Sequence, residues 1–274
     1  MTLARHRPVL GALAALLLSS TAALAQLSDD VVKIGVLTDM NGPASTPTGQ
    51  GSVTAAQMAV DDFGGKVLGS VKPPFATPDL SSFILQAQAS KAKIIGIAAG
   101  PPNNTNEIKT AGEFGVFKGG QQMAGLLVLI TDIHSLGLPA AQGLLLTTSF
   151  YWDMDDKTRE WSKRYFAKIN RMPTMWQAGV YSSVTNYLNA IKDSGTDDPL
   201  KVAAKMREKP IEDFFSRNGS LREDNLMVHD LMLVQVKKPE ESKYPWDYYK
   251  LIATISPEDA ARPLEASECP LVKK

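Results

Sequence analysis

Short apolar runs alternate with helical periodicity through the first half of the chain. The run over 33–38 has the sequence KIGVLT, which is apolar and partly β-branched, and the turn-forming residues Asn41-Gly42-Pro43 follow it. A helix is predicted from Ser52, because its apolar residues recur every three or four positions and so share one face: Val53, Ala56, Ala59, Val60 and Phe63. Gly64-Gly65 ends this helix, and 66–68 begins another extended segment. The pattern predicts a strand–helix–strand unit.

The same alternation continues to residue 149. It predicts helices over 78–89 and 104–114, and strands over 93–98, 123–130 and 143–149. Near-continuous apolar strands that alternate with helices are typical of a parallel sheet covered on both faces. We therefore expect an α/β fold with a doubly wound, mostly parallel sheet.

Helices dominate the pattern after Tyr151. Three are predicted, over 156–169, 174–192 and 199–208. Residues 219–236 then show the alternation of antiparallel strands, and 246–255 is expected to form a further strand. The tail that follows is predicted to be a loose strap.

The first 25 residues have the features of a cleavable export signal. Arg5 and Arg7 form a basic segment, 9–18 is apolar, and Ala23-Leu24-Ala25 fits the small residues that signal peptidase requires. A membrane anchor is the alternative interpretation, but the apolar run is short of the ~20 residues that a spanning helix needs. The expectation is an exported protein that begins at Gln26.

Composition and charge exclude several classes of protein. The chain is 44% hydrophobic and 21% charged, so it can bury a core and is not expected to be disordered. Its 29 Lys+Arg balance 29 Asp+Glu; without Arg5 and Arg7 the difference is 27 − 29 = −2. This charge argues against a nucleic-acid binder. Cys269 is the only cysteine, which rules out a disulfide scaffold and a four-cysteine zinc site.

Catalytic and cofactor motifs are nearly absent from the sequence. The three histidines (His6, His134 and His229) lie far apart, without other ligands at metal-binding spacing. Ser90 to Lys93 matches a serine-x-x-lysine pattern but lacks that motif's companion elements. Gly49-Gln50-Gly51 precedes a helix, but Thr54 replaces the third glycine of a dinucleotide fingerprint. No enzyme activity, metal or cofactor is expected; the glycine loop instead suits an anion or a carboxylate.

Polar residues concentrate where the predicted parallel strands end. In open parallel sheets, ligands bind beyond the carboxyl ends of the strands. The loops there (39–48, 100–105, 131–134 and 149–153) contribute hydroxyls, amides, carboxylates and aromatic rings. These groups suit a zwitterionic or carboxylated small molecule; ordinary loop polarity is the alternative.

Several stretches resemble one family. They are KIGVLTDMNGP (33–43), the helix over 51–65, FILQAQA (83–89), ITDIHSLG (130–137), FYWD (150–153), MPT (172–174), VHD (228–230) and the terminal CPLVKK. Together they resemble the branched-chain-amino-acid-type periplasmic substrate-binding proteins of ABC transporters. The resemblance covers almost the whole chain and implies the type I periplasmic binding fold, in which two α/β lobes close on a small molecule and deliver it to a membrane permease.

The sequence departs from the family after its first helix. The family continues there with further strand–helix units of the first lobe, whereas 65–69 runs directly into sequence that resembles the second lobe. We interpret this as an in-frame loss with its seam near 64–69. Since the lobes are pseudo-repeats, the first unit is expected to take the place of the lost opening unit of lobe two. The expected organisation is a signal peptide (1–25), a first-lobe strand–helix unit (26–65), a second-lobe α/β core (66–149), and crossover helices, strands and tail (150–274).

The resemblance implies a periplasmic solute-binding component of an ABC transporter, impaired by the loss of most of the first lobe. Its expected partners are an amino-acid-like or carboxylated solute and an inner-membrane permease, and nucleic acid is not expected. Self-association is expected, because helices such as 156–170 lose the surface against which they would pack. Alternatives are an exported interaction or regulatory module without solute binding, or a non-functional remnant. The expected ligand-binding residues are Asp39, Asn41, Ser45, Thr46, Asn103, Thr105, Thr131, Asp132, Tyr151 and Trp152.

Overall fold

The computed structural model describes residues 33–38, 57–58, 60, 64, 66–74 and 76–272. All of them belong to one structural unit, Val32–Lys274. The predicted export signal lies outside the described residues, as does most of the helix expected from Ser52.

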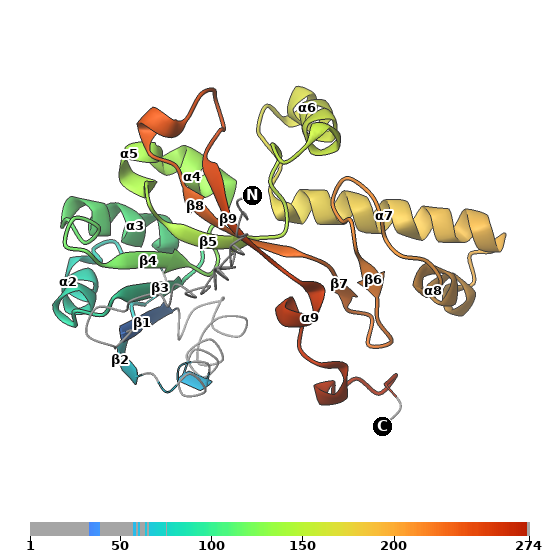
Figure 1. Cartoon of the computed structure of the whole chain (residues 1–274), viewed down its shortest axis with the longest axis horizontal. Helices are drawn as coiled ribbons and strands as arrows, with labels where there is room; N and C mark the ends of the chain where they lie inside the picture. Colours follow the sequence, from blue (N-terminus) through green and yellow to red (C-terminus); the bar gives the residue numbers. More distant parts are fainter. Residues whose placement is uncertain are drawn as a thin grey trace, which may run out of the picture. The chain divides into compact units, whose positions relative to one another are not determined.

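A seven-stranded sheet organises this unit (Figure 1). Its order is β2-β1-β3-β4-β5-β8-β9. The first five strands in this order are parallel to one another, and β8 is antiparallel to both of its neighbours, β5 and β9. The strands are β1 (Lys33–Thr38), β2 (Lys66–Val71), β3 (Ile94–Ala98), β4 (Gln122–Gly125), β5 (Leu145–Thr148), β8 (Leu231–Val236) and β9 (Tyr249–Ile255). The predicted α/β class with a mostly parallel sheet is confirmed.

The first strand lies inside the sheet. β1 pairs in parallel with β2 on one side and with β3 on the other, and Thr38 is in register with Ala98. Strand order 2-1-3-4-5 reverses direction between β1 and β3, so the carboxyl ends of these two strands form a topological switch point. The opening strand thus completes the sheet that the rest of the chain builds, as the sequence predicted.

Five helices lie on the predicted segments: α2 (Ser81–Ala89), α3 (Asn103–Glu113), α6 (Asp156–Ile169), α7 (Met175–Ser194) and α8 (Pro199–Arg207). Three described helices were not predicted: α4 (Ile130–Leu136), α5 (Leu138–Ala141) and α9 (Pro257–Ala260). Local caps explain their ends: Asp155 accepts from the Thr158 amide at 2.8 Å before α6, and the Thr174 hydroxyl accepts from the Trp176 amide before α7. Gly195 ends α7 with a φ of 66°, which glycine adopts without strain.

Short elements connect the rest of the C-terminal half. The hairpin of β6 (Ser220–Leu221) and β7 (Met227–Val228) forms a separate two-stranded sheet. The 3-10 turns η2 (Pro239–Glu241) and η3 (Leu264–Ala266) lie in the connections, and η3 and α9 occupy the tail that was predicted to be a loose strap.

The strand predicted over 123–130 is wrong in its second half. β4 ends at Gly125, the chain turns, and Ile130 begins helix α4. The turn is tight, because a Cβ on Gly125 would lie 2.5 Å from Cγ2 of Val128. An apolar run alone does not distinguish a strand from the start of a buried helix. Residues 131–134 therefore lie in a helix rather than in the predicted loop.

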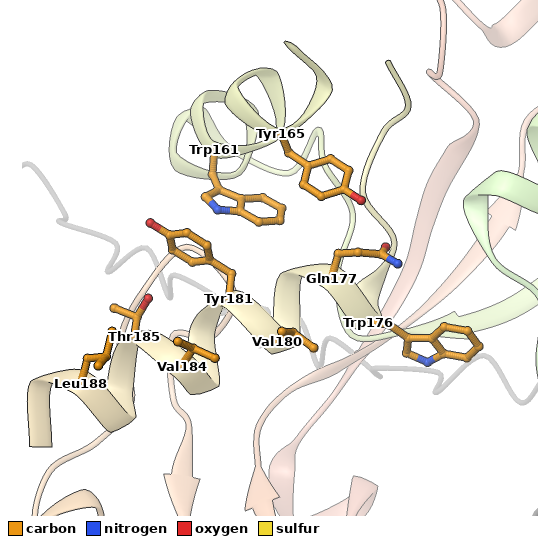
Figure 2. A pocket seen from close by; sticks show the side chains of 9 residues that line it. All are labelled: Trp161, Tyr165, Trp176, Gln177, Val180, Tyr181, Val184, Thr185 and Leu188. Atoms are coloured by element: carbon orange, nitrogen blue, oxygen red, sulfur yellow. The ribbon is translucent and has the colours of Figure 1, made fainter. Parts of the chain in front are cut away.

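Helices α6 and α7 lie next to each other and form a groove (Figure 2). Trp161 and Tyr165 contribute the α6 side, and Tyr181 lies between them and the α7 backbone. The rings of Trp161 and Tyr181 are 5.4 Å apart and meet edge to face. On its other side, α7 packs against α8.

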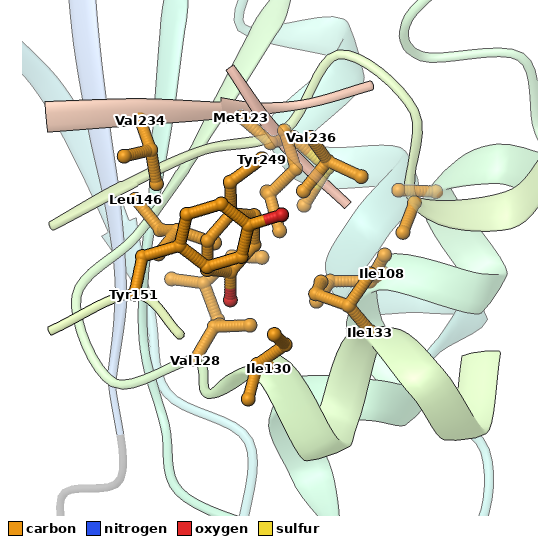
Figure 3. Packing of buried hydrophobic residues seen from close by; sticks show 14 of the residues in the cluster. Ile108, Met123, Val128, Ile130, Ile133, Leu146, Tyr151, Val234, Val236 and Tyr249 are labelled. Atoms are coloured by element: carbon orange, nitrogen blue, oxygen red, sulfur yellow. The ribbon is translucent and has the colours of Figure 1, made fainter. Parts of the chain in front are cut away.

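The main core fills the space between the sheet and helices α3 and α4 (Figure 3). Ile108 of α3 and Ile133 of α4 are fully buried, and they face Met123, Leu146 and the apolar side of β8. Each such side chain stabilises the fold by ~1.5–3 kcal/mol relative to exposure. This core fixes the starts of both helices, which carry several predicted site residues.

Candidate functional site

The carboxyl ends of β3, β4 and β5 bring most of the described site residues to one edge of the sheet. Asn103 and Thr105 lie in the first turn of α3 after β3, Thr131 and Asp132 in the first turn of α4 after β4, and 151–152 just after β5. Parallel strands end at the same edge, so this grouping follows from the topology. Thr38, the last residue of β1, pairs with Ala98 at that edge.

Asn103 is buried, and the oxygen of its side-chain amide has no hydrogen-bond partner among the described residues. Its Nδ2 donates to the carbonyl oxygen of Pro74 at 3.0 Å, which ties α3 to the segment after β2. Its Oδ1 is buried and has no hydrogen-bond partner among the described residues. A buried acceptor without a donor costs ~1–3 kcal/mol, so the position suits a donor from a bound molecule. Thr105 lies nearby, and its hydroxyl donates to the carbonyl of Pro102.

Asn104 and Asp132 lock the starts of α3 and α4 together. The Asn104 Nδ2 donates to Oδ2 of Asp132 at 3.2 Å and to the Leu127 carbonyl at 3.0 Å. Oδ2 of Asp132 also accepts from the Leu129 amide at 2.9 Å, which caps α4. Burial raises the pKa of Asp132, and these hydrogen bonds lower it in part. Asp132 was predicted from the sequence, whereas the role of Asn104 follows only from the packing of the two helix starts.

Tyr151 and Trp152 are buried against the segment before β9. The Trp152 indole Nε1 donates to the Trp246 carbonyl at 2.9 Å, and the Tyr151 hydroxyl lies 3.4 Å from the same oxygen. The Tyr151 ring packs 5.1 Å from that of Tyr249 (Figure 3). Burial raises the pKa of Tyr151 above its usual range. In this structure both predicted residues support the chain around Trp246, which has a left-handed φ of 70°.

His134 lies at the end of α4 and belongs to the same aromatic cluster. Its ring stacks on Trp246 with a centroid distance of 3.8 Å, and its Nδ1 is 2.8 Å from the Tyr248 hydroxyl. The histidine therefore has a packing role here. Among the described residues no group of three histidine, cysteine or carboxylate side chains is placed to hold a metal ion.

Glu107 is a buried carboxyl group that the sequence analysis did not select. It lies one turn after Asn103 on the same side of α3, and both carboxyl oxygens are buried without a hydrogen-bond partner among the described residues. Burial raises its pKa to about 8, so the carboxyl group is largely protonated at neutral pH. No sequence signal marks such a residue, because a glutamate in a helix is normally exposed.

The remaining predicted site residues, Asp39, Asn41, Ser45 and Thr46, lie outside the described residues. The described part of the site offers amide, hydroxyl and carboxyl groups at the edge of a parallel sheet. These groups are able to form hydrogen bonds with a small molecule, and no activated nucleophile with an adjacent base is found among the predicted site residues that the structure describes. In the same part of the chain no helix is long and apolar enough to cross a bilayer.

In open parallel α/β sheets a switch point with polar side chains is the usual place for a small ligand. The family model described as "Periplasmic binding protein" matches residues 62–243. The chain belongs to the periplasmic binding protein family, whose members bind solutes rather than catalyse reactions. This confirms the predicted family and the type I fold.

Solved structures agree with the family assignment. A periplasmic binding protein from Burkholderia mallei is 44% identical, with a TM-score of 0.79 over 88% of this chain and 63% of its own. A branched chain amino acid ABC transporter periplasmic ligand-binding protein from Burkholderia xenovorans LB400 is 40% identical, with a TM-score of 0.80 over 90% and 65%. A solute binding protein of an ABC transporter from Rhodopseudomonas palustris BisB5, in complex with 3,4-dihydroxy benzoic acid, shares the fold at 19% identity (TM-score 0.69, 83% and 61%).

The chain spans 63% and 65% of the length of the two Burkholderia proteins. A comparison with curated proteins finds no significant match.

Proposed function

We propose that this protein is the periplasmic solute-binding component of an ABC transporter, and that its solute is an amino-acid-like or carboxylated small molecule. The observation that carries the proposal is the family match together with the switch point, where Asn103 places an unpaired buried acceptor at the edge of the sheet. The protein would be exported by a cleavable signal peptide and would deliver its solute to a permease in the inner membrane.

The chemistry of the site supports this solute class. Oδ1 of Asn103 can accept from an ammonium or hydroxyl group, and the Thr131 hydroxyl can donate to a carboxylate. The Thr105 hydroxyl, whose hydrogen goes to Pro102, can still accept a hydrogen bond. Asp132 adds a negative group at the same edge. The B. xenovorans protein is named for branched-chain amino acids, and the R. palustris protein holds an aromatic acid, so both kinds of solute are candidates.

The proposal includes the loss of most of the first lobe, with the seam near Gly64 to Gly69. It is supported by the shorter length relative to the Burkholderia proteins and by the position of β1, which lies directly beside β2 in one sheet. Asp39, Asn41, Ser45 and Thr46 would then come from the borrowed first-lobe unit rather than from an opposing lobe. Closure of two lobes excludes water and doubles the contacts, so a chain with one lobe would bind its solute orders of magnitude more weakly than a complete relative.

Thermal shift measurements test the proposal. The protein is heated with leucine, 4-hydroxybenzoate, succinate or acetamide at about 10 mM, which is 100 times a Kd of about 0.1 mM and stabilises the protein by ~2.7 kcal/mol. A solute-dependent rise in Tm is expected for at least one carboxylated probe and not for acetamide.

A matched pair of variants locates the effect. Thr131→Val removes a hydroxyl from the first turn of α4, and Ser135→Ala removes one from the exposed end of the same helix. The solute-dependent shift should fall in the first variant and persist in the second. No shift with any carboxylated probe, or equal shifts in both variants, would contradict the proposal.

A further inference from the structure

The outward face of α7 is more apolar than the face that packs inward. Trp176, Val180, Val184 and Leu188 recur every fourth residue, and their exposed fractions are 51%, 63%, 52% and 56%. Tyr181 and Tyr187 flank this stripe and are also exposed. We call these six side chains the α7 stripe. An isolated exposed leucine is ordinary, but a contiguous stripe of six large side chains marks an interaction surface.

The inward face of the same helix shows the opposite composition. Ala178, Ser182 and Ala190 are buried there and are small or polar, and Ser182 donates to Asp213 at 2.6 Å. A solvent-facing helix normally places its apolar residues inward and its polar residues outward. Helix α7 therefore carries apolar surface on the side that nothing covers among the described residues.

A groove lies beside the α7 stripe. The groove between α6 and α7 has a volume of about 620 Å³, and Trp161 and Tyr165 form its α6 wall (Figure 2). Trp176 lies at one end of the stripe and lines the groove there, with about half of its side chain exposed (Figure 2). The surface therefore has an exposed aromatic ring that can insert into a partner and a groove that can accept a side chain from it.

The size and charge of the stripe suit a small self-complementary interface. Six large side chains, each about half exposed, offer on the order of 500 Å² of apolar surface, since an aromatic side chain alone buries about 150–250 Å². A standard interface takes about 800 Å² from each partner, so this surface corresponds to a small interface and a weak, micromolar dimer. No charged residue occurs in α7 from Met175 to Ile191, so two copies do not repel each other here.

The spacing of the stripe also fits two-fold symmetry. In an antiparallel pair with its axis between Val180 and Val184, these residues of one copy face Val184 and Val180 of the other. The same operation places Trp176 opposite Leu188, so all four positions find apolar partners. A crossing angle of about +20° keeps the two helices close to antiparallel and lets contacts continue along the whole stripe. We infer that the α7 stripe and the α6–α7 groove form a homodimer interface, with a second copy of this chain as the occupant.

Sedimentation velocity tests the inference on the purified protein. Across about 1 to 100 µM, the range in which a micromolar dimer dissociates, the protein should change from monomer to dimer. Val184→Glu brings two carboxylates to the axis and should raise the dimer Kd at least about 100-fold. Asn189→Glu is the control, because it adds the same charge at an exposed position about 100° around the helix from Leu188.

The outcomes separate dimerisation from damage to the fold. Both substitutions replace exposed side chains, so circular dichroism should show the same helix content as in the unchanged protein; Trp176→Ala serves as a second variant at the end of the stripe. A monomer at all concentrations would overturn the inference, as would a dimer that survives Val184→Glu or one that Asn189→Glu disrupts equally. These results do not depend on solute binding, which the thermal shift assay tests separately.

Discussion

Glu107 makes the stability of this protein strongly dependent on pH. Burial without a hydrogen-bond partner raises its pKa from the ordinary 4.5 to about 8 in the folded chain. The folded state therefore keeps a proton that the unfolded state releases above pH 4.5. A raised pKa gives its full stabilisation below the unfolded value and loses it as the pH rises toward the folded value.

The magnitude follows from the width of this window. Between pH 4.5 and about 8, the free energy of unfolding should fall by about 1.4 kcal/mol per pH unit, which amounts to about 5 kcal/mol in total. Above pH 8 the loss levels off, because both states are then ionised. Since domains are stable by only about 5–15 kcal/mol, one carboxyl group would decide much of the pH dependence.

Glu107→Gln removes this dependence and keeps the shape of the side chain. Urea unfolding at pH 5, 6, 7 and 8, followed by tryptophan fluorescence, should show the variant gaining about 4 kcal/mol relative to the unchanged protein between pH 5 and pH 8. Glu113→Gln, in the exposed last turn of the same helix, should show no such gain. If the difference between Glu107→Gln and the unchanged protein stays constant within about 0.5 kcal/mol, the reasoning about Glu107 is refuted.

Three further predictions concern packing and caps. Gly125→Ala should destabilise the protein by ~1–3 kcal/mol in urea unfolding, because the added Cβ would collide with Val128. Gly69→Ala is the control, because the space around its Cβ is open, and equal losses of stability in the two variants would contradict this prediction. Ile108→Ala removes a fully buried side chain and should cost ~2–5 kcal/mol, and a smaller loss would show that the core collapses around the cavity. Thr174→Ala removes the cap of α7 and should lower stability by about 1 kcal/mol, which Thr174→Ser should restore.

Much of the fold was predictable because local signals and burial agree. The capping residues Asp155 and Thr174 mark the starts of α6 and α7, and both helices begin where the sequence predicts. The apolar β-branched run over 33–38 predicts β1 in the same way. The place of β1 in this sheet, by contrast, was expected only from the pseudo-repeat of the family, and its register with β2 and β3 was not predicted.

The errors and omissions have a shared physical origin. The apolar run over 123–130 contains a tight glycine turn that only the approach of Val128 reveals. The contact of Trp152 with the Trp246 carbonyl joins residues 94 positions apart, which no local pattern encodes. Their positions after predicted strands correctly placed Asn103 and Asp132 at one sheet edge. The hydrogen-bond partners that hold them, Pro74 for Asn103 and Asn104 for Asp132, follow only from tertiary packing.

The position of β1 between β2 and β3 governs the order in which this chain can assemble. Its two neighbours, β2 and β3, begin 33 and 61 residues after Lys33, so an N-terminal segment must wait until both have left the translocation pore or the ribosome. Contacts over such separations slow folding, because loop closure precedes the gain from pairing. Until β3 emerges, the side of β1 that later pairs with β3 has no partner, and a protease cut that removed β1 would separate β2 from the sheet and leave β3 as an edge strand.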